Sequence, residues 1–386
     1  METSGFFLPK FFEMMTALIN STIYTGEEKL TDKVLLLKDG KINALIKAGD
    51  IPADADIIDC KGHNLAAGLI DLQIYGAGGK LFGGVPTEEA LERMENTLLS
   101  EGCTGFMATV ATNSDDVVLQ AITSAKAYRK RAKGNFLGLH LEGPYLNAKR
   151  KGAHPEKYIK KATLAEVKSW VDQAEGEIKI ITIAAELQDQ EIIEYLNGQG
   201  IIVSNGHSDA SFEEASGFFN KGVHAATHLF NAMPQMHHRN PGLIPAIFEQ
   251  KPFTSVVADG IHVSFPMIRL AKRELDEKLF LITDAVTSSS EGAYPHVFTG
   301  DRYTMPDGTL SGSCLSMLKA VQNCVKEVGI NLDEALRMAS LYPAQLIKKD
   351  HLVGKIKAGY EANLILFDNE FNPLSVFLGG ETHKMV

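Results

Sequence analysis

The chain has 386 residues, 45% of them hydrophobic, and a net charge of −10 at pH 7, so it can bury a sizeable core. The negative charge argues against a broad surface for nucleic acid or acidic lipid, although a local basic pocket for one small anion remains compatible with it. Its four cysteines include no C-x-x-C pair, which argues against a disulfide framework or a thiolate zinc site and fits a reducing cytoplasm.

The two chain ends are expected to build one small β domain, from residues 1–64 and 346–386. The first 20 residues are apolar but interrupted by a proline and charged residues, so we expect a leader that packs on the body rather than a secretion signal. Two apolar runs around Asp39-Gly40 predict a hairpin, and "ANLILFD" predicts a strand near the C-terminus. Each end alone offers too few strands to bury a core, so we expect them to pair.

The middle of the chain, residues 65–345, alternates apolar runs with amphipathic stretches. The strand candidates are, in chain order, AAGLIDLQIYG, GFMATVAT, FLGLHLEG, IKIITIAAE, IIVSNGH, HAATH, FTSVVADG and FLITDA. Residues 87–100, between the first two, place apolar side chains on one helical face. Eight strands with helical spacers over roughly 280 residues predict a (β/α)8 barrel, an α/β fold whose usual size is about 250 residues. An open doubly wound sheet is the alternative.

Polar residues collect at the ends of these predicted strands, where barrel enzymes carry their catalytic groups. Glu142 ends the third run, His207 the fifth, His228 the sixth and Asp284 the eighth, and His262 follows the seventh. Closure of the barrel would bring these five residues around one mouth.

This set of residues predicts amide hydrolysis assisted by a metal. One carboxylate and two imidazoles, from Glu142, His207 and His228, suit zinc or another borderline divalent ion, with a position left for water. Such an ion can lower the pKa of its water to about 7 and polarise a carbonyl oxygen. Asp284 is placed to take the proton from that water and pass it to a leaving amine, and His262 to hydrogen-bond the substrate or the developing oxyanion.

Each residue also has a simpler structural interpretation. Among 12 histidines, a single one is more often a surface or core side chain than a ligand, and Asp284 alone could cap a helix. His140 shares a strand face with Glu142 and is expected to be a supporting or core residue. His237 and His238 are expected in a loop. The glycine-rich residues 75–84 match no phosphate-binding motif and are expected to form a loop after the first strand.

A family resemblance rests on ordered motifs from about residue 17 to the end. They are GLIDLQIYGAGG, GLHLEGPYLN, KGAHP, SNGHSDA, THLFNAM, ADGIHV, LITDA, TLSGSCLSM and GKIKAGYEANLILFD. In this order they resemble the N-acetylglucosamine-6-phosphate deacetylases of the amidohydrolase superfamily. The resemblance implies a (β/α)8 barrel with a small β-sandwich domain, a divalent metal, and hydrolysis of N-acetyl-D-glucosamine 6-phosphate to D-glucosamine 6-phosphate and acetate in amino-sugar catabolism.

The resemblance also implies roles for single residues. Glu142, His207 and His228 match the metal ligands, and Asp284 matches the catalytic acid–base residue. The implied substrate contacts are Ala153, His154, Asn231, Ala232, His262, Leu310, Ser311, Gly312 and Ser313. Arg239 matches an arginine that binds the substrate phosphate from the second subunit of a homodimer, although the residues around it are less typical. A guanidinium suits a phosphate dianion, which would reconcile an acidic protein with an anionic substrate.

The expected number of metal ions follows from one departure from the superfamily pattern. Many amidohydrolases hold a second ion with H-x-H after the first strand, where this chain has Gln73-Ile74-Tyr75. The fourth run also lacks a lysine placed to become a bridging carbamate. We therefore expect one divalent ion per subunit, zinc first, with iron, cobalt and manganese also suited to the ligands.

Two alternatives stay open for the function, and the other partners follow from composition. The same chemistry could act on N-acetylgalactosamine 6-phosphate or another amide, since fold and metal do not separate these substrates. A non-catalytic binding relative is the remote alternative. We expect no nucleic-acid partner, no membrane partner and a cytoplasmic location.

Overall fold

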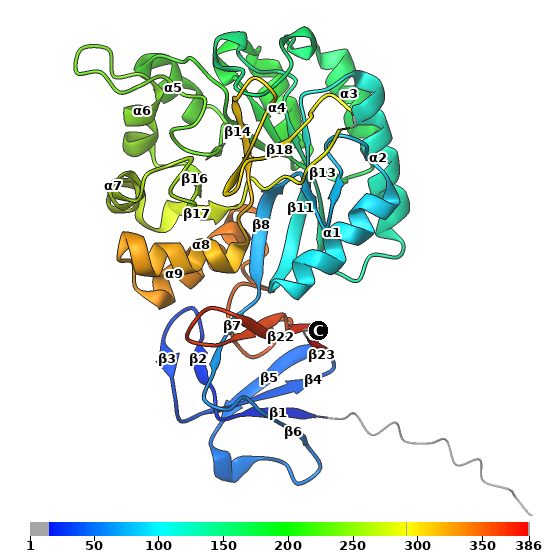
Figure 1. Ribbon diagram of the computed structural model, residues 1–386, viewed down its shortest axis with the longest axis vertical. Coiled ribbons are helices and arrows are strands. Elements are labelled where there is room, and N and C mark those ends of the chain that lie inside the picture. Colours follow the sequence, from blue (N-terminus) through cyan, green and yellow to red (C-terminus); the bar gives the residue numbers. More distant parts are fainter. Residues whose placement is uncertain (1–14, 291, 385–386) are drawn as a thin grey trace, which may run out of the picture.

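The computed structural model describes residues 15–290 and 292–384 of the chain. A helix-covered barrel lies at one end of the molecule and a small β domain at the other (Figure 1). The predicted leader falls largely on residues 1–14, outside the described residues. Within the described ranges no helix is long and apolar enough to cross a membrane.

The barrel is an eight-stranded parallel sheet, which confirms the predicted (β/α)8 architecture over the open sheet. Its strands, in chain and spatial order, are β8 (Leu69–Ile74), β11 (Cys103–Ala111), β12 (Phe136–Glu142), β13 (Ile178–Ile183), β14 (Ile202–Asn205), β15 (Ala225–Ala226), β16 (Phe253–Val257) and β17 (Leu279–Ile282). Every predicted run supplies one strand, although β15 has only two residues. A parallel bridge between Ile74 and Ala285 links the first strand to the residues that follow the last one.

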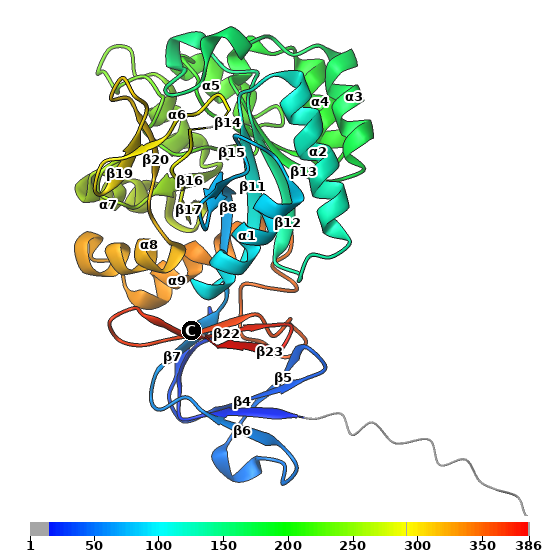
Figure 2. The same ribbon diagram turned by 45° about the vertical axis from the view of Figure 1, so that its right-hand side comes forward.

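Helices cover the outside of the barrel (Figures 1 and 2). They are α1 (Glu88–Ser100), α2 (Asp115–Arg129), α3 (Leu164–Ala174), α4 (Gln190–Gly198), α5 (Phe212–Phe219), α6 (Leu243–Gln250), α7 (Phe265–Leu275), α8 (Met317–Asn323), α9 (Leu332–Ala339) and α10 (Leu341–Leu346). Helix α1 shows how the sequence specifies them. The Thr87 hydroxyl accepts a hydrogen bond from the backbone of Ala90 and caps the helix, and the predicted apolar face, with Leu91 and Met94, is buried.

The small domain is a β-sandwich built from both chain ends, as predicted. One sheet holds β1 (Thr16–Ile19), β4 (Val34–Lys38), β5 (Lys41–Ile46) and β6 (Asp56–Asp59). The other holds β2 (Thr22–Tyr24), β3 (Lys29–Leu30), β7 (Asn64–Ala67), β21 (Leu364–Phe367), β22 (Pro373–Leu378) and β23 (Glu381–Lys384). Side chains such as Leu18, Leu35 and Leu364 form the core between the sheets.

Two short antiparallel pieces complete the fold. The glycine-rich residues 75–84, expected as a loop, contain the ladder β9 (Gly76–Ala77) with β10 (Lys80–Leu81), because the glycines allow the chain to double back. After β17, the strands β18 (Val297–Phe298), β19 (Arg302–Thr304) and β20 (Leu310–Ser313) form a three-stranded sheet. This sheet lies away from the small domain (Figure 2).

The small domain shares a core with the barrel. Ile365 is fully buried and belongs to the same apolar cluster as the barrel strands. Gly102, just before β11 begins, has φ +89°, and a Cβ there would lie 2.0 Å from Ile365 Cδ1. The close approach of the two domains therefore depends on a glycine, and the start of β8 is held against the sandwich. The strand ends that could carry chemistry lie at the opposite end of the barrel.

This shared core predicts a destabilising effect of Ile365→Ala on the barrel. Truncation of a buried isoleucine costs about 2–5 kcal/mol. Trp170, the one tryptophan of the chain, lies in α3 of the barrel, so its fluorescence during urea unfolding reports on the barrel itself. We expect a lower midpoint for Ile365→Ala and no shift for Leu187→Ala, whose side chain is 43% exposed. An unchanged midpoint for Ile365→Ala would show that the barrel does not depend on the sandwich.

Candidate active site

A cavity with about 770 Å³ of empty space, partly continuous with solvent, lies at the carboxyl ends of the barrel strands. The predicted residues that line it are Glu142, Ala153, His154, His207, His228, Asn231, Ala232, His262, Asp284, Leu310, Ser311 and Gly312. The fold thus gathers nearly all of the predicted residues, which are scattered over the sequence, around one opening.

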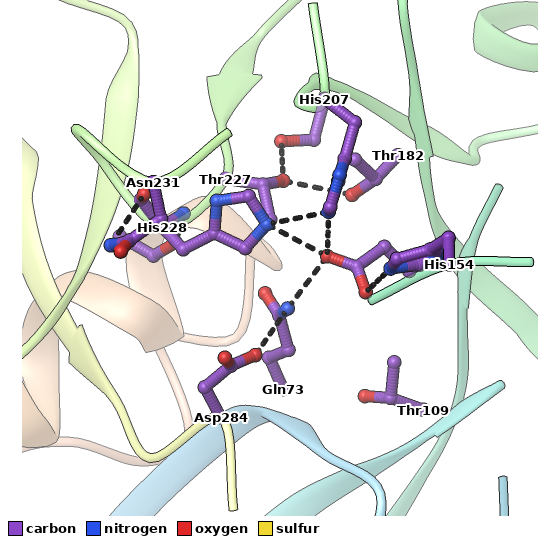
Figure 3. A network of polar contacts seen from close by, with 12 residues as sticks. Gln73, Thr109, His154, Thr182, His207, Thr227, His228, Asn231 and Asp284 are labelled. Carbon is purple, nitrogen blue, oxygen red and sulfur yellow. Dashed lines mark hydrogen bonds and ion pairs between the residues drawn. The ribbon is translucent and has the colours of Figure 1, made fainter. Parts of the chain in front are cut away.

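Glu142 is the centre of this site. It ends β12, and only 1% of the residue is exposed. His228 Nε2 lies 3.0 Å and His207 Nε2 3.5 Å from its Oε1 atom, and His154 Nε2 lies 3.3 Å from its Oε2 atom. Figure 3 shows these imidazoles converging from separate segments of the chain. The structure therefore adds His154 to the predicted group around the carboxylate.

Neighbouring carbonyl and hydroxyl groups set the orientation of two imidazoles. His207 Nδ1 lies 2.8 Å from the carbonyl oxygen of Arg150, which can only accept, so Nδ1 carries the proton. The Thr112 hydroxyl donates to the carbonyl oxygen of Glu142, 3.3 Å away, and its oxygen therefore accepts from His154 Nδ1 at 2.8 Å. When either ring carries only this one proton, the lone pair of its Nε2 faces Glu142.

Lone pairs that converge on a carboxylate repel one another unless a cation or a proton lies between them. The nitrogen and oxygen atoms that Glu142, His154 and His207 offer lie within 4.8 Å of one another, and His228 Nε2 is 3.1 Å from His207 Nε2. Carboxylate oxygen and imidazole nitrogen are ligands that zinc and related ions accept. The residues present therefore fit a divalent metal ion.

The electrostatics of Glu142 depend on these partners. Burial alone would raise the pKa of Glu142, but its contacts with the imidazoles of His154, His207 and His228 hold it well below its usual range. Burial also lowers the pKa of His154 to about 4, which keeps this ring neutral near pH 7. Glu142 is thus an ionised carboxylate next to the neutral ring of His154, whereas the hydrogen bond and the charge of Glu142 outweigh burial and raise the pKa of His228.

Asp284 lies on the other side of the cavity floor. Burial, and then the charge of Glu142, raise the pKa of the Asp284 carboxyl. Its φ of 54° is in the left-handed region, as are those of His207 (48°) and His228 (38°). Non-glycine residues rarely adopt this conformation, and such strain concentrates at functional sites. The backbone is therefore bent at three strand ends so that these side chains face the mouth.

His262 is oriented by a carboxylate that the sequence patterns did not single out. Its Nδ1 lies 2.6 Å from Asp259 Oδ2, and both side chains are buried. Asp259 also accepts hydrogen bonds from the backbone of Ile261 and His262. The ring is therefore fixed through Nδ1, which leaves Nε2 for a ligand in the cavity.

Two predicted residues do not line the cavity. Arg239 is exposed in a loop with His237 and His238, which confirms the loop expected for the two histidines. Ser313 is buried, and its hydroxyl donates to the carbonyl oxygen of Thr283.

Below the cavity, His140 is buried and bonded to Leu72 and Thr182, as expected for a core residue.

Four further residues belong to the site but were not among the predicted site residues: Tyr75, Tyr294 and His296 line the cavity, and Gln73 lies behind its wall. Gln73 and Tyr75 were discounted as metal ligands, yet both contact Glu142, and their i, i+2 spacing at the end of the first strand was the available signal. Tyr294 donates to the carbonyl oxygen of Thr112, and His296 Nδ1 lies 2.9 Å from Ser311 Oγ. These last residues come from the irregular segment after β17, where no periodicity indicates a site.

Comparison with known proteins identifies matches over nearly the whole chain. The profile of the amidohydrolase family matches residues 64–383, and that of the NagA composite domain matches residues 15–65. An N-acetylglucosamine-6-phosphate deacetylase of Haemophilus influenzae is 35% identical over 95% of this chain and 99% of its own. An N-acetylgalactosamine-6-phosphate deacetylase of a Shewanella species is 33% identical over 82% of both chains. The crystal structure of N-acetylglucosamine-6-phosphate deacetylase from Pasteurella multocida matches with a TM-score of 0.92 at 37% identity, over 96% of this chain and 100% of that one.

The geometry predicts that Glu142→Gln binds metal poorly. The amide keeps the shape of the side chain but removes the charge that compensates a cation. We expect the affinity for zinc, measured by competition with a chromogenic chelator, to fall by about 100-fold or more, since even the loss of an outer partner costs 10–100-fold. Glu177→Gln is the matched control, because Glu177 is a buried carboxylate paired with Arg129 just before β13 begins. Zinc affinity equal to that of the wild type in Glu142→Gln would contradict the assignment of this ligand.

Proposed function

This chain belongs to the amidohydrolase family, in its group of N-acetylglucosamine-6-phosphate deacetylases, and we propose that it hydrolyses N-acetyl-D-glucosamine 6-phosphate to D-glucosamine 6-phosphate and acetate. The observation that carries this proposal is the convergence of Glu142, His207 and His228 opposite Asp284 in one cavity. Its relatives of that name in Haemophilus influenzae and Pasteurella multocida are similar over nearly their full length.

We infer that Glu142, His207 and His228 hold one divalent ion per subunit, with zinc as the first candidate. When bound, such an ion lowers the pKa of a water and polarises the carbonyl oxygen of the acetamido group. His154 lies on the second oxygen of Glu142. We assign His154 to substrate binding, next to the reacting acetamido group, and not to the metal.

Asp284 moves the proton in this scheme. Its carboxylate takes a proton from the attacking water, the new C–O bond forms, and the same proton passes to the sugar nitrogen as the C–N bond breaks. Acetate and the amine then leave. A carboxyl group whose pKa is raised by burial and by the charge of Glu142 is suited to hold that proton between the two transfers. His262, fixed by Asp259, bonds the substrate oxygen through Nε2.

The phosphate needs a cation that the cavity wall does not supply. Among the described residues that line the cavity there is no lysine or arginine. Arg239 lies exposed outside the cavity of its own subunit, which suits an arginine that serves a neighbouring one. We propose a homodimer in which Arg239 binds the phosphate of the substrate held by the partner. The remaining contacts would come from Ala153, Asn231, Ala232 and the backbone of 310–313.

A second substrate is supported by one relative. The Shewanella protein that is 33% identical is named for N-acetylgalactosamine 6-phosphate, which differs from the first substrate only in the configuration of one sugar hydroxyl.

We also propose a cytoplasmic location. All four cysteines are free, which suits a reducing compartment.

The first test of the function is acetate release from N-acetylglucosamine 6-phosphate. The unphosphorylated sugar and N-acetylgalactosamine 6-phosphate are run beside it, with the metal content of the protein measured in parallel. We expect the first substrate to be preferred, and Asp284→Asn to keep its metal while turnover falls by about 10²–10⁴-fold. Protein that contains metal but releases no acetate from any of the three sugars would refute the proposed substrate class.

The role of Arg239 predicts complementation between two weakened variants. Arg239→Ala should raise KM by about 30-fold or more through loss of a charge-assisted contact, whereas Arg131→Ala, an exposed arginine paired with Glu88, should not. When Arg239→Ala and Asp284→Asn subunits are mixed and exchanged, each mixed dimer holds one intact site. Activity at low substrate should then recover to about a quarter of the wild-type value. No recovery in verified mixed dimers would show that Arg239 does not act across the interface.

A further inference from the structure

We propose that Gln73 is a positioning residue, whose side-chain amide holds the carboxylates of Asp284 and Glu142 in their working orientation. Gln73 Nε2 lies 2.8 Å from Asp284 Oδ1 and 2.9 Å from Glu142 Oε1. Figure 3 shows the amide of Gln73 pointing at Asp284 on the cavity floor. The inference rests on the proposed function, because the proton transfer by Asp284 is part of that proposal.

The chemistry of the amide fixes which end faces the carboxylates. The NH2 group has two hydrogens, which are shared among three oxygen acceptors: one oxygen of each carboxylate and, at 2.9 Å, the hydroxyl oxygen of Tyr75. The reversed amide would direct its carbonyl oxygen at two anionic groups. Tyr75 donates its own proton to the second oxygen of Glu142. Gln73 is therefore a pure donor at this point, and it is neutral at every pH at which the protein folds.

Asp284 depends on this amide more than Glu142 does. Glu142 has three imidazoles and Tyr75 around it, whereas Gln73 is the only side chain in the described part of the chain that hydrogen-bonds Asp284. Without the amide, two carboxylates of like charge would face each other across the floor of the cavity. The torsion of the Asp284 side chain would then be unconstrained, and repulsion would turn it away from Glu142.

The backbone supports the same pairing. The backbone N–H of Asp284 donates to the carbonyl oxygen of Gln73 at 3.0 Å. The backbone N–H of Tyr75 donates to the carbonyl oxygen of Ala285 at 2.9 Å. These bonds link β8 to the segment after β17, where the barrel closes. Gln73 and Asp284 are thus hydrogen-bonded to each other twice, once through the main chain and once through their side chains. The main-chain bonds would remain in a variant that changes only the side chain of Gln73.

The test compares Gln73→Leu and Gln73→Glu with the wild type, and uses Thr109→Val as the matched control. Leucine removes both donors at similar size, and glutamate keeps the shape but adds a third negative charge. Thr109 lies on the neighbouring strand β11 and accepts a hydrogen bond from the backbone of Ile74, without touching either carboxylate. Each holoprotein is assayed for kcat, KM and metal content, and crystal structures of the wild type and Gln73→Leu are compared.

We expect Gln73→Leu to keep its metal and a KM within about twofold of the wild type, while kcat falls by about 10–100-fold, as small misplacements of catalytic groups do. The fall in kcat should be larger in Gln73→Glu, and the kcat of Thr109→Val should equal that of the wild type. In the crystal, the carboxylate of Asp284 should turn away in Gln73→Leu. An unchanged kcat, or a loss that merely follows loss of metal, would overturn the inference.

The crystallographic comparison separates this inference from the proposed function. If the wild type contains metal but deacetylates none of the sugars, the proposed function fails, and the position of Asp284 in Gln73→Leu still decides whether Gln73 holds it. An Asp284 carboxylate that stays in place without the amide would overturn the positioning role, whatever the substrate of the enzyme.

Discussion

The buried carboxylate of Glu142 is the constraint on which the rest of the site depends. An ionised group that is 1% exposed must be compensated by charge and hydrogen bonds, because desolvation disfavours it strongly. Here the compensation comes from β8, from the loop that carries His154, and from the ends of β14 and β15. The turn after Glu142 is equally constrained: Gly143 has φ +88°, and a Cβ there would lie 2.1 Å from Thr112 Oγ1. Only glycine lets the chain leave the strand at this point.

Closure of the barrel brings together the groups that compensate the charge of Glu142. Parallel strands place their carboxyl ends on one side, so Glu142, His207, His228 and Asp284 meet there although they lie far apart in the sequence. His207, His228 and Asp284 adopt the left-handed backbone conformation, which costs free energy. Packing in the barrel and the sandwich offsets this cost. The sandwich contributes at the other end, where Ile365 packs into the barrel core. The sandwich thus supports the barrel at the end opposite to the mouth, where the polar residues of the site gather.

The sequence predicted those features that local patterns encode. Eight apolar runs predicted the barrel, and polar residues at the ends of several of them predicted the placement of Glu142, His207, His228 and Asp284. The i, i+2 spacing of Gln73 and Tyr75 indicated a shared strand face, but their contacts with Glu142, and that of Gln73 with Asp284, depend on how strands distant in the sequence pack together. The pairing of Asp259 with His262 requires the turn of the loop itself, and Tyr294 lies in an irregular segment. Arg239 is a different case, since its proposed partner lies on another copy of the chain.

The distribution of charge explains why metal and a second subunit would both be needed. The cavity contributes two carboxylates and, among its described lining residues, no basic side chain except histidine, and a phosphate adds about −1.5 to −2 at pH 7. The cation proposed beside Glu142 would compensate the acetamido end of the substrate, where negative charge develops during hydrolysis. It could not serve the phosphate as well, because a sugar ring separates the two groups. A protein with a net charge of −10 would therefore have to bring a second positive group to the far end of the cavity. The proposed arginine loop of a partner would do so without burying an unpaired charge in the isolated subunit.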